Sequence, residues 1–325
     1  MTLLDFLWFG FVFSMSAAVV WVSLREGWAR RLALDVPNAR SLHSSPVSRA
    51  GGLLVMPWVL LGAVVLTTKV MLVGFVAGLA VISFADDRFG LPIAVRFFAH
   101  LLLSGLAVIE IGVAGVLPLL LFTLAITWMT NLFNFMDGSD GLAGGMAVFG
   151  FGAYAVAALY ASDQLTAQFS LCIVGGMLAF LLFNFSPARI FLGDAGSISL
   201  GFLAAVLGLL GWQAGSWEFW FPFLVFSPFI VDATVTLLRR ALRGERVWQA
   251  HREHSYQKLV QIGWSHRKTA LAEYGLMAAM AVLALVLLQM EKSVVAIVLA
   301  MTAVMYALII AAIDVKWRHF QHVTG

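Results

Sequence analysis

Long apolar segments follow one another along this chain, and they allow only one class of fold. Hydrophobic residues make up 62% of the 325 residues and charged residues only 11%, whereas soluble domains carry about 25% charged residues. A helix crosses the roughly 30 Å of bilayer hydrocarbon with about 20 apolar residues. We read eleven such segments, at 3–24, 51–68, 70–85, 93–111, 116–134, 141–161, 166–184, 196–213, 217–238, 268–289 and 293–313.

The segments are expected to be helices, because every backbone polar group inside the bilayer must bond within the protein. We therefore predict an all-α integral membrane protein with about eleven transmembrane helices, in which residues 1–325 form a single domain. The first segment carries Asp5 and no positive region before it, so it is expected to remain as a span rather than to be cleaved. Cys172 is the single cysteine and is expected to be a buried thiol.

Lysines and arginines are strongly biased to one set of loops, which predicts the orientation in the membrane. Eighteen of the 20 basic residues lie in, or at the helix ends beside, the loops 25–50, 86–92, 135–140, 185–195 and 239–267 and the tail after 313. Only Lys69 and Lys292 fall on the other side. The N-terminus is therefore expected outside and the C-terminus in the cytoplasm, with the polar stretches described below on the cytoplasmic side.

Two neighbouring carboxylates, Asp86 and Asp87, end the third segment. Charges so close to hydrocarbon are costly, and one interpretation is that the headgroup layer simply solvates them. Like charges side by side also raise one pKa or attract a cation. A general base or a Mg²⁺ site would use such a pair, since Mg²⁺ prefers carboxylate and phosphate oxygens.

The fifth segment runs into a stretch rich in asparagine and aspartate. Asn131 and Asn134 stand three residues apart and so share a helix face. Asp137 and Asp140 repeat this spacing across a turn that contains glycine. A helix cap followed by a turn is the alternative, but a cap needs one carboxylate and no asparagine pair. The stretch therefore predicts amide donors and carboxylate acceptors for a polar ligand.

A third polar stretch follows the seventh segment and contains Asn184, Pro187, Arg189 and Asp194. Pro187 is expected to end the helix. Asp194 is expected at or near the N-cap of the next helix, where capping alone would account for it. Capping does not account for Arg189, whose guanidinium suits a phosphate.

The largest loop on the basic side, 239–267, carries His251, Arg252 and His254. Two histidines without a cysteine or an obvious third ligand predict zinc only weakly. A basic loop beside a membrane also has an ordinary role in topology and in attracting anionic lipid, but we favour an anionic phosphate ligand for the histidine cluster. Asp232, one turn after Pro228 in the ninth segment, is expected to face the bundle interior and to support the site.

The polar stretches together resemble those of one enzyme family. They are Asp35–His43, Arg49–Gly52, Asp86-Asp87, Asn131–Asp140, Pro187–Asp194 and His251–His254. In these stretches the chain is similar to the polyprenyl-phosphate N-acetylhexosamine-1-phosphate transferases of glycosyltransferase family 4. That family includes the phospho-MurNAc-pentapeptide translocases and the initiators of O-antigen and enterobacterial common antigen. The stretches occur in the family's order over most of the chain.

The resemblance implies roles for individual residues. It implies that Asp194 is the Mg²⁺ ligand, with Mn²⁺ as the alternative ion, and that Asp86 and Asp87 either activate the lipid phosphate or hold metal and phosphate. Substrate binding is implied for His43, Arg49, Asn131, Asn134, Asp137, Asp140, Asn184, Arg189, His251, Arg252 and His254. The His-Arg-Glu-His sequence at 251–254 is closer to the O-antigen initiators than to the translocases, which argues against a muramyl-pentapeptide donor.

The implied reaction is a phosphotransferase reaction of the EC 2.7.8 type at the cytoplasmic face of a bacterial inner membrane. Undecaprenyl phosphate would accept a sugar 1-phosphate from a UDP-N-acetylhexosamine, release UMP and begin a cell-surface polysaccharide such as the O-antigen of lipopolysaccharide. The donor stays open between N-acetylglucosamine, N-acetylfucosamine and N-acetylquinovosamine. A homodimer is compatible with the resemblance, and no nucleic-acid partner is expected. The rival class is a secondary transporter, which would concentrate its charges near the bilayer midplane.

Overall fold

The computed structural model describes residues 3–37, 46–66, 69–249 and 251–324. Apart from one small antiparallel sheet, its regular elements there are helices. They are α1 (Leu3–Arg25), α2 (Trp28–Leu32), β1 (Leu34–Asp35), β2 (Val47–Ser48), α3 (Gly51–Leu66), α4 (Val70–Phe89), α5 (Ile93–Ile111), α6 (Val116–Phe135), α7 (Leu142–Tyr160), α8 (Gln164–Asn184), α9 (Asp194–Gln213), α10 (Trp220–Val225), α11 (Ser227–Leu242), α12 (Ser255–Gln261), α13 (His266–Leu287) and α14 (Lys292–Thr324). The prediction of an all-α membrane protein is confirmed in class.

The number of spans is smaller than predicted. Within the described residues, nine helices are long and apolar enough to cross a membrane: α1, α4, α5, α6, α7, α8, α9, α13 and α14. The predicted span 51–68 coincides with α3, which is apolar but has only 16 residues in the described range. The predicted span 217–238 is not continuous either, because it is divided into α10 and α11.

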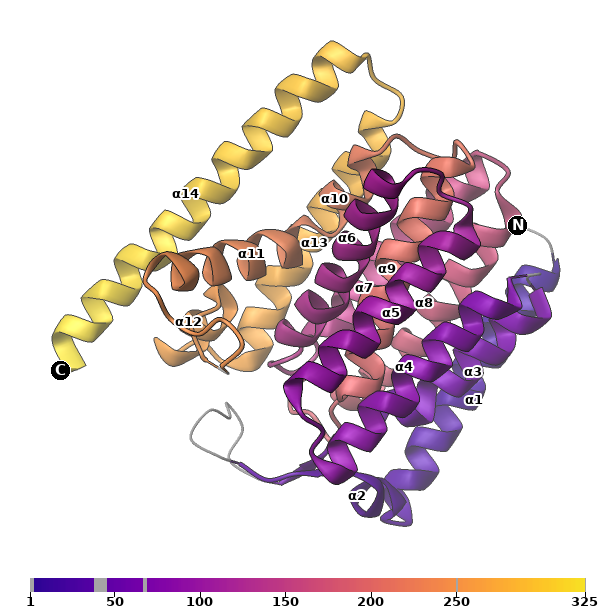
Figure 1. Ribbon diagram of the computed structural model, residues 1–325. Helices are drawn as coiled ribbons and strands as arrows, with labels where there is room; N and C mark the ends of the chain where they lie inside the picture. Colours follow the sequence, from indigo (N-terminus) through magenta and orange to yellow (C-terminus); the bar gives the residue numbers. More distant parts are fainter. Residues whose placement is uncertain (1–2, 38–45, 67–68, 250, 325) are drawn as a thin grey trace.

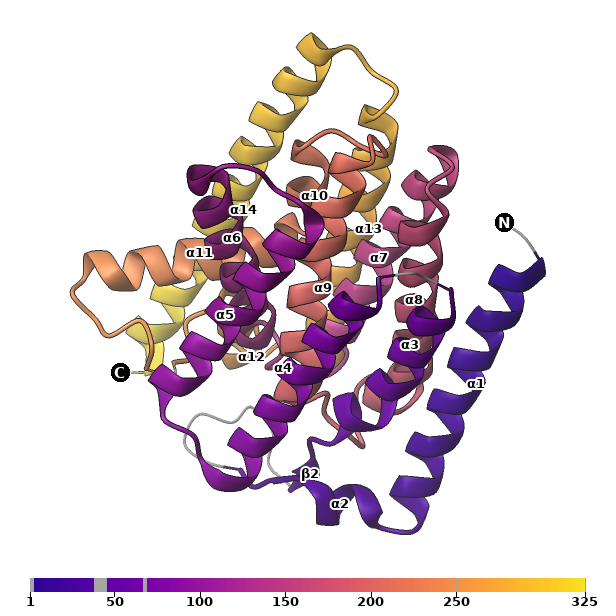
Figure 2. The ribbon, with the colours of Figure 1, turned by 45° about the vertical axis from the view of Figure 1, so that its right-hand side comes forward.

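The division occurs at Phe226, between the two short helices. Pro228 lies in the first turn of α11 and has no N–H to offer the carbonyl of Leu224. The side chain of Ser227 donates to that carbonyl instead, at 2.7 Å. After the break, α11 runs across the direction of the neighbouring helices, as Figures 1 and 2 both show. The ninth segment, predicted as one span, is therefore two helices that differ in direction.

Small residues let the central helices approach closely. In the most apolar stretch of α9, 83% of the residues are buried. In that of α14 only 17% are buried, and this helix stands apart from the bundle (Figure 1). A Cβ added to Gly52 of α3 would lie 2.2 Å from the backbone nitrogen of Gly196 in α9. Only glycine permits this contact between two helix backbones. Cys172 is free and buried in α8, as predicted.

One end of the bundle gathers the short elements and most of the polar loops. The helices α2 and α12 and the small sheet lie at this end (Figures 1 and 2). In the sheet, Leu34 pairs with Ser48 and Asp35 with Val47, and a parallel bridge joins Ser48 to Ile190. This pairing brings the loop after α8 onto the segment before α3, and it places Arg49 beside the start of α9.

Candidate active site

The start of α9 is built against the segment that precedes α3. The N–H of Gly51 donates to the carbonyl of Phe191 at 2.9 Å, and the N–H of Gly52 donates to that of Leu192 at 2.7 Å. Gly193 is the N-cap of α9, with φ +72°, and an added Cβ would lie 2.1 Å from the Arg49 carbonyl. Asp194 follows as the first residue of α9. The predicted cap position of Asp194 is thus confirmed within one residue.

Asn134, at the end of α6, contacts this helix start directly. Its side-chain amide donates to Oδ1 of Asp194 at 2.9 Å and to the hydroxyl of Ser197 at 3.0 Å. Asn131, one turn earlier, donates to the carbonyl of Thr127 at 2.7 Å. Asn134 therefore points toward α9, whereas Asn131, on the same face of α6, hydrogen-bonds His100 of α5.

The two carboxylates at the end of α4 have different surroundings. Asp86 accepts from the N–H of Leu91 at 2.8 Å and from the guanidinium of Arg96 in α5 at 2.6 Å. Asp87 lies 3.3 Å from the guanidinium of Arg49, and its side chain is 6% exposed. Asp87 is also close enough to Asp194 for the two carboxylates to repel each other. Asp86 therefore holds the α4–α5 connection, whereas Asp87 faces the Asp194 cluster.

Asp137 adds a further carboxylate to this cluster from the loop after α6. It accepts a hydrogen bond from the backbone N–H of Gly193. Burial, and then repulsion by Asp194, raise the pKa of the Asp137 carboxyl well above its ordinary value of 3.8. In the described part of the chain three carboxylates, those of Asp87, Asp137 and Asp194, meet here with Arg49 as the cation in contact, an arrangement that favours binding of a cation.

The carboxylates of this cluster fit Mg²⁺ only together with ligands from outside the protein. Among the described residues, no group of three or more His, Cys, Asp or Glu side chains is arranged to hold a metal ion by itself. Mg²⁺ at phosphate-binding sites commonly uses one or two carboxylates and completes its shell with water and substrate phosphates. Asp194, with Asp87 and Asp137 close enough to repel it, fits that second arrangement.

The loop before α12 lies beside the cluster and is held by Asp232. This carboxylate accepts from the backbone N–H of Ser255 at 2.8 Å and of Tyr256 at 3.3 Å, and it lies 3.8 Å from Nδ1 of His254. Tyr256 then donates its hydroxyl to the carbonyl of Phe135 at 3.2 Å. The supporting role expected for Asp232 agrees with these contacts.

His251 and His254 are neighbours, with ring centroids 4.8 Å apart. Burial, and then the charges of His254 and Arg240, lower the pKa of His251 from 6.5 to about 4. A neutral imidazole follows at ordinary pH. His254 is 2% exposed and stacks on Tyr256, so His251 is the more accessible ring of the two.

Several predicted substrate-binding residues make no contact with Asp194 in the described part of the chain, among them Asp140, Asn184, Arg189 and Arg252. Asp140 accepts from the N–H of Ala188 at 3.1 Å, and Asn184 bonds the backbone of Gly141 and Ile190. These two side chains therefore hold loops together. Arg189 lies over the Phe183 ring at 5.8 Å and, like Arg252, is exposed. The remaining candidate, His43, lies outside the described residues.

Arg96 and His100 belong to the site but were not predicted from the sequence. Both lie on α5, four residues apart and so on one face. His100 is 4% exposed and hydrogen-bonds the side chain of Asn131. It also interacts electrostatically with Asp194 and Asp86. Two ionisable residues on one face of an apolar helix were the signal that would have found them.

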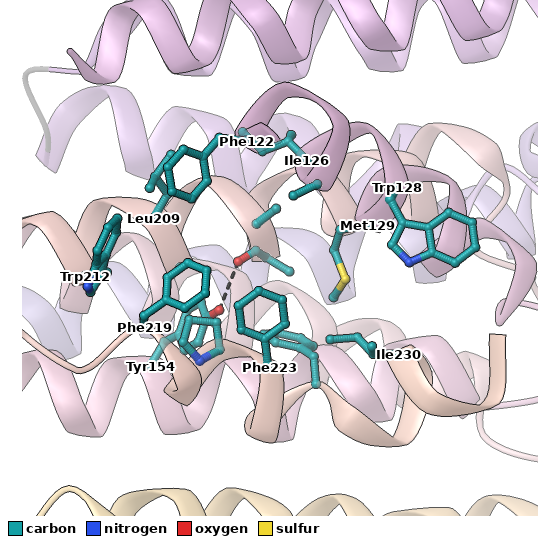
Figure 3. Close-up of a pocket in the computed structure, with 16 residues that line it drawn as sticks. Phe122, Ile126, Trp128, Met129, Tyr154, Leu209, Trp212, Phe219, Phe223 and Ile230 are labelled. Atoms are coloured by element: carbon teal, nitrogen blue, oxygen red, sulfur yellow. Dashed lines mark hydrogen bonds between the residues drawn. The ribbon is translucent and has the colours of Figure 1, made fainter. Parts of the chain in front are cut away.

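An apolar pocket of about 120 Å³ opens between α6, α9, α10 and α11 (Figure 3). Trp128 and Met129 line its wall on α6, within one turn of Asn131. Phe223 and Ile230 close it from the broken segment, and Tyr154 donates to the Ala204 carbonyl at 3.0 Å within it. An apolar pocket and a carboxylate cluster thus share one helix.

The sequence of this chain is similar to proteins of one known family. The model of glycosyl transferase family 4 matches residues 69–211. A Bacillus subtilis (strain 168) protein named probable undecaprenyl-phosphate N-acetylglucosaminyl 1-phosphate transferase is 30% identical over 266 residues, covering 74% of each chain. The chain belongs to glycosyl transferase family 4.

Two other relatives frame its place within the family. A decaprenyl-phosphate N-acetylglucosaminephosphotransferase of Mycobacterium tuberculosis (strain ATCC 25618 / H37Rv) is 29% identical over 293 residues, covering 74% of this chain and 72% of that one. A phospho-N-acetylmuramoyl-pentapeptide-transferase of Listeria monocytogenes serovar 1/2a is 36% identical, but only over 151 residues, or 45% of this chain and 44% of its own. Family membership favours a transferase over the transporter considered as its rival.

Proposed function

We propose that this protein transfers an N-acetylhexosamine 1-phosphate from a UDP-sugar to undecaprenyl phosphate and releases UMP. The observation that carries the proposal is the position of the Asp87–Asn134–Asp194 cluster beside an apolar pocket on the same helix, α6. A lipid phosphate needs both environments, because its chain is apolar and its headgroup is anionic. N-acetylglucosamine is the first sugar to test, since two relatives carry it in their names.

The reaction joins two anions, so positioning and charge control matter more than a strong base. An oxygen of the lipid phosphate forms a new bond to the phosphorus that carries the sugar. The bond from this phosphorus to the oxygen of the UMP phosphate breaks, and the electron pair leaves with UMP. Mg²⁺, when bound, would neutralise charge on the diphosphate and on the leaving group.

The protein residues divide the remaining work. Asp194 would hold the ion, and the Asn134 amide would fix the orientation of that carboxylate. Arg49 lies beside Asp87 and offers a cation to a phosphate at the same point. The 251–254 loop would complete the donor side, with His251 as a neutral ring that can donate or accept a hydrogen bond to the sugar or phosphate.

The cellular setting is part of the same proposal. The lysine and arginine bias supports a location of the site end at the cytoplasmic face of the membrane, which we propose is a bacterial inner membrane. UDP-sugars are soluble, so a donor would arrive from the cytosol, while the acceptor would arrive through the membrane. The lipid-linked product would begin a cell-surface polysaccharide of the O-antigen type, and the His-Arg-Glu-His loop supports this over a muramyl-pentapeptide donor.

The test is UMP release by the detergent-purified protein with undecaprenyl phosphate, a panel of UDP-N-acetyl sugars, and either Mg²⁺ or EDTA. The decisive variant is Asp194→Asn. Its matched control is Asp163→Asn, because Asp163 accepts from Thr166 and Ser216 at the other end of the bundle. We expect release that requires lipid and Mg²⁺, is lost in Asp194→Asn and persists in Asp163→Asn. Release by wild type that Asp194→Asn retains would reject the assignment of the site, and absence of release with every donor would reject the proposed substrates.

A further inference from the structure

A second polar pocket lies where α11, α12 and α14 meet, and none of the predicted site residues lines it. Its cavity volume is about 510 Å³, within the range of about 300–1,000 Å³ typical of ligand sites. Its walls are Val235, Thr236, Arg239, Arg243, Glu253, Ser255, Lys258, Ile310, Asp314, Trp317, Arg318 and Gln321.

The charge of this pocket is positive. Four cations line it, against the two carboxylates Glu253 and Asp314. Asp314 accepts from Arg239 at 2.6 Å and from Lys258 at 2.7 Å, so one carboxylate serves two cations. Arg318 is exposed and takes part in no ion pair within the described residues. The pocket therefore has donors to spare for an anion.

The pocket spans the level at which α14 leaves the hydrocarbon. The helix carries no charged residue from Ser293 to Ile313, a run that extends about 31 Å at 1.5 Å per residue and so matches the bilayer core. Ile310 lies inside this run, Asp314 directly after it, and Trp317 one turn further, where aromatic residues favour the interface. The pocket is thus apolar toward the membrane and cationic toward the water.

We propose that this pocket binds the phosphate of an anionic membrane phospholipid, such as phosphatidylglycerol. Basic pockets between transmembrane helices at this level recognise such headgroups. A soluble phosphate would not need the apolar walls of Val235, Ile310 and Trp317. Lipid can also reach the pocket sideways, because α14 stands away from the bundle and has α12 as its main helix neighbour (Figure 1). The site is separate from both proposed substrates.

A lipid in this pocket would affect the loop that carries residues 251–254, the histidine loop. Glu253 and Ser255 line the pocket, and they are the two neighbours of His254 in the sequence. Lys258 also lines the pocket and belongs to α12, which begins directly after His254. A bound phosphate between Arg318 and Lys258 would add a second link between α14 and α12 to the bond from Lys258 to Asp314. It would thereby restrict the loop that Asp232 holds from the other side. We therefore infer that anionic phospholipid stabilises the loop conformation described here.

The test measures lipid binding directly, by native mass spectrometry of the full-length, delipidated protein. The probes are phosphatidylglycerol, zwitterionic phosphatidylethanolamine, undecaprenyl phosphate and inorganic phosphate. Arg318→Gln removes a cation from the pocket, and Lys316→Gln removes one from an exposed position of the same helix outside it. We expect Arg318→Gln to weaken phosphatidylglycerol binding about fivefold, the effect of one cation near a membrane surface, and Arg318→Lys to restore most of it.

Several outcomes would overturn the proposal. Equal phosphatidylglycerol binding by wild type and Arg318→Gln would do so, as would an equal loss in Lys316→Gln. Competition by inorganic phosphate would identify a soluble anion as the occupant, and stronger binding of undecaprenyl phosphate that depends on Arg318 would identify the acceptor. Melting temperatures show whether each variant is folded. Because the readout is binding rather than UMP release, the result stands whether or not the proposed transferase reaction is found.

Discussion

The side-chain amide of Asn134 donates to Oδ1 of Asp194 at 2.9 Å, across 60 residues of sequence. This bond joins the end of α6 to the first residue of α9. The backbones of the two helices are close enough to fix it, since a Cβ on Gly201 of α9 would lie 2.5 Å from the Met129 carbonyl of α6. The protein thus holds one carboxylate oxygen, and no hydrogen bond to the other is found within the described residues, which suits an ion ligand.

Removing the amide should therefore impair metal use before it impairs folding. We expect Asn134→Ala to lower UMP release about 10- to 100-fold and to raise the Mg²⁺ concentration needed for half-maximal rate, as losing the partner of a metal ligand commonly does. The measurement is the Mg²⁺ dependence of UMP release.

Gln168 offers a matched control for this variant. Its amide donates to Asp5 at 2.8 Å, which is the same kind of bond far from the site. Gln168→Ala should change the melting temperature but leave the Mg²⁺ requirement as in wild type. An unchanged Mg²⁺ requirement in Asn134→Ala would show that the amide does not orient a metal ligand.

The two adjacent aspartates should separate in function. Asp86→Asn loses a charge-assisted bond with the partly exposed Arg96, at a cost of about 1 kcal/mol, and should retain measurable UMP release. Asp87→Asn removes a carboxylate that faces Arg49 and Asp194, and we expect a loss of at least about 100-fold. Rates and melting temperatures of both variants check this prediction, and the reverse order of activities would contradict it.

The charged Asp137 carboxylate should lower the stability of the metal-free folded protein while contributing to its function. Its folded-state pKa is raised above 3.8, so its contribution to stability is present below that pH and is lost as the pH rises through the folded-state pKa. Asp137→Asn keeps an acceptor for the Gly193 N–H and removes the charge. In EDTA at neutral pH we expect a higher melting temperature than that of wild type. Added Mg²⁺ should stabilise wild type more than the variant, and an equal gain would refute a role of Asp137 near the ion.

The predictable part of this fold is the part that hydrophobicity and local spacing control. Long apolar runs located the helices, and the Gly-Asp pair at 193–194 located the start of α9. The break at Phe226 was not predicted, because the apolar run continues through it and was interpreted as one span. Whether a proline bends a helix or ends it depends on which neighbour donates a hydrogen bond to the freed carbonyl, and here the Ser227 hydroxyl does so.

The candidate site was predictable in its location but not in its partners. Acids at helix ends pointed to Asp87 and Asp194, yet nothing local distinguishes Asp87 from Asp86, because their partners Arg49 and Arg96 come from the segment before α3 and from α5. Asn184 carries the same amide group as Asn134, and Asp140 the same carboxylate as Asp194. Both of these side chains nevertheless bond to backbone groups. Only the tertiary fold shows which polar side chains are used to build loops and which remain for a ligand.

The histidine loop should lose stability in mild acid. The pKa of His251 is lowered from 6.5 to about 4, so the unfolded chain binds a proton in that interval and the folded chain does not. Stability from this residue is complete above the unfolded pKa and falls as the pH drops toward about 4. Melting temperatures between about pH 7.5 and 4.5 should therefore fall more steeply for wild type than for His251→Asn. Parallel slopes would mean that His251 is protonated in the folded protein.

The last prediction concerns the contact between the histidine loop and the aspartate-rich turn. A Cβ on Gly138 would lie 2.1 Å from the hydroxyl oxygen of Tyr256 and 3.2 Å from the ring carbon that carries it. Gly138 does not have a positive φ, so Gly138→Ala should act through this clash alone. Because the Tyr256 ring is fully buried and follows His254, it cannot yield without moving the loop, and we expect UMP release to fall at least about tenfold.

Removing the hydroxyl should relieve the clash. Tyr256→Phe alone loses the bond to the Phe135 carbonyl, at a cost of about 1 kcal/mol. In that background Gly138→Ala meets only the 3.2 Å contact, which small shifts can accommodate, so the double variant should be more active than Gly138→Ala alone. A coupling energy of about 1–3 kcal/mol in this double-mutant cycle is the expected result. Additive losses would show that Gly138 is required for another reason, such as close approach of the substrate to its backbone.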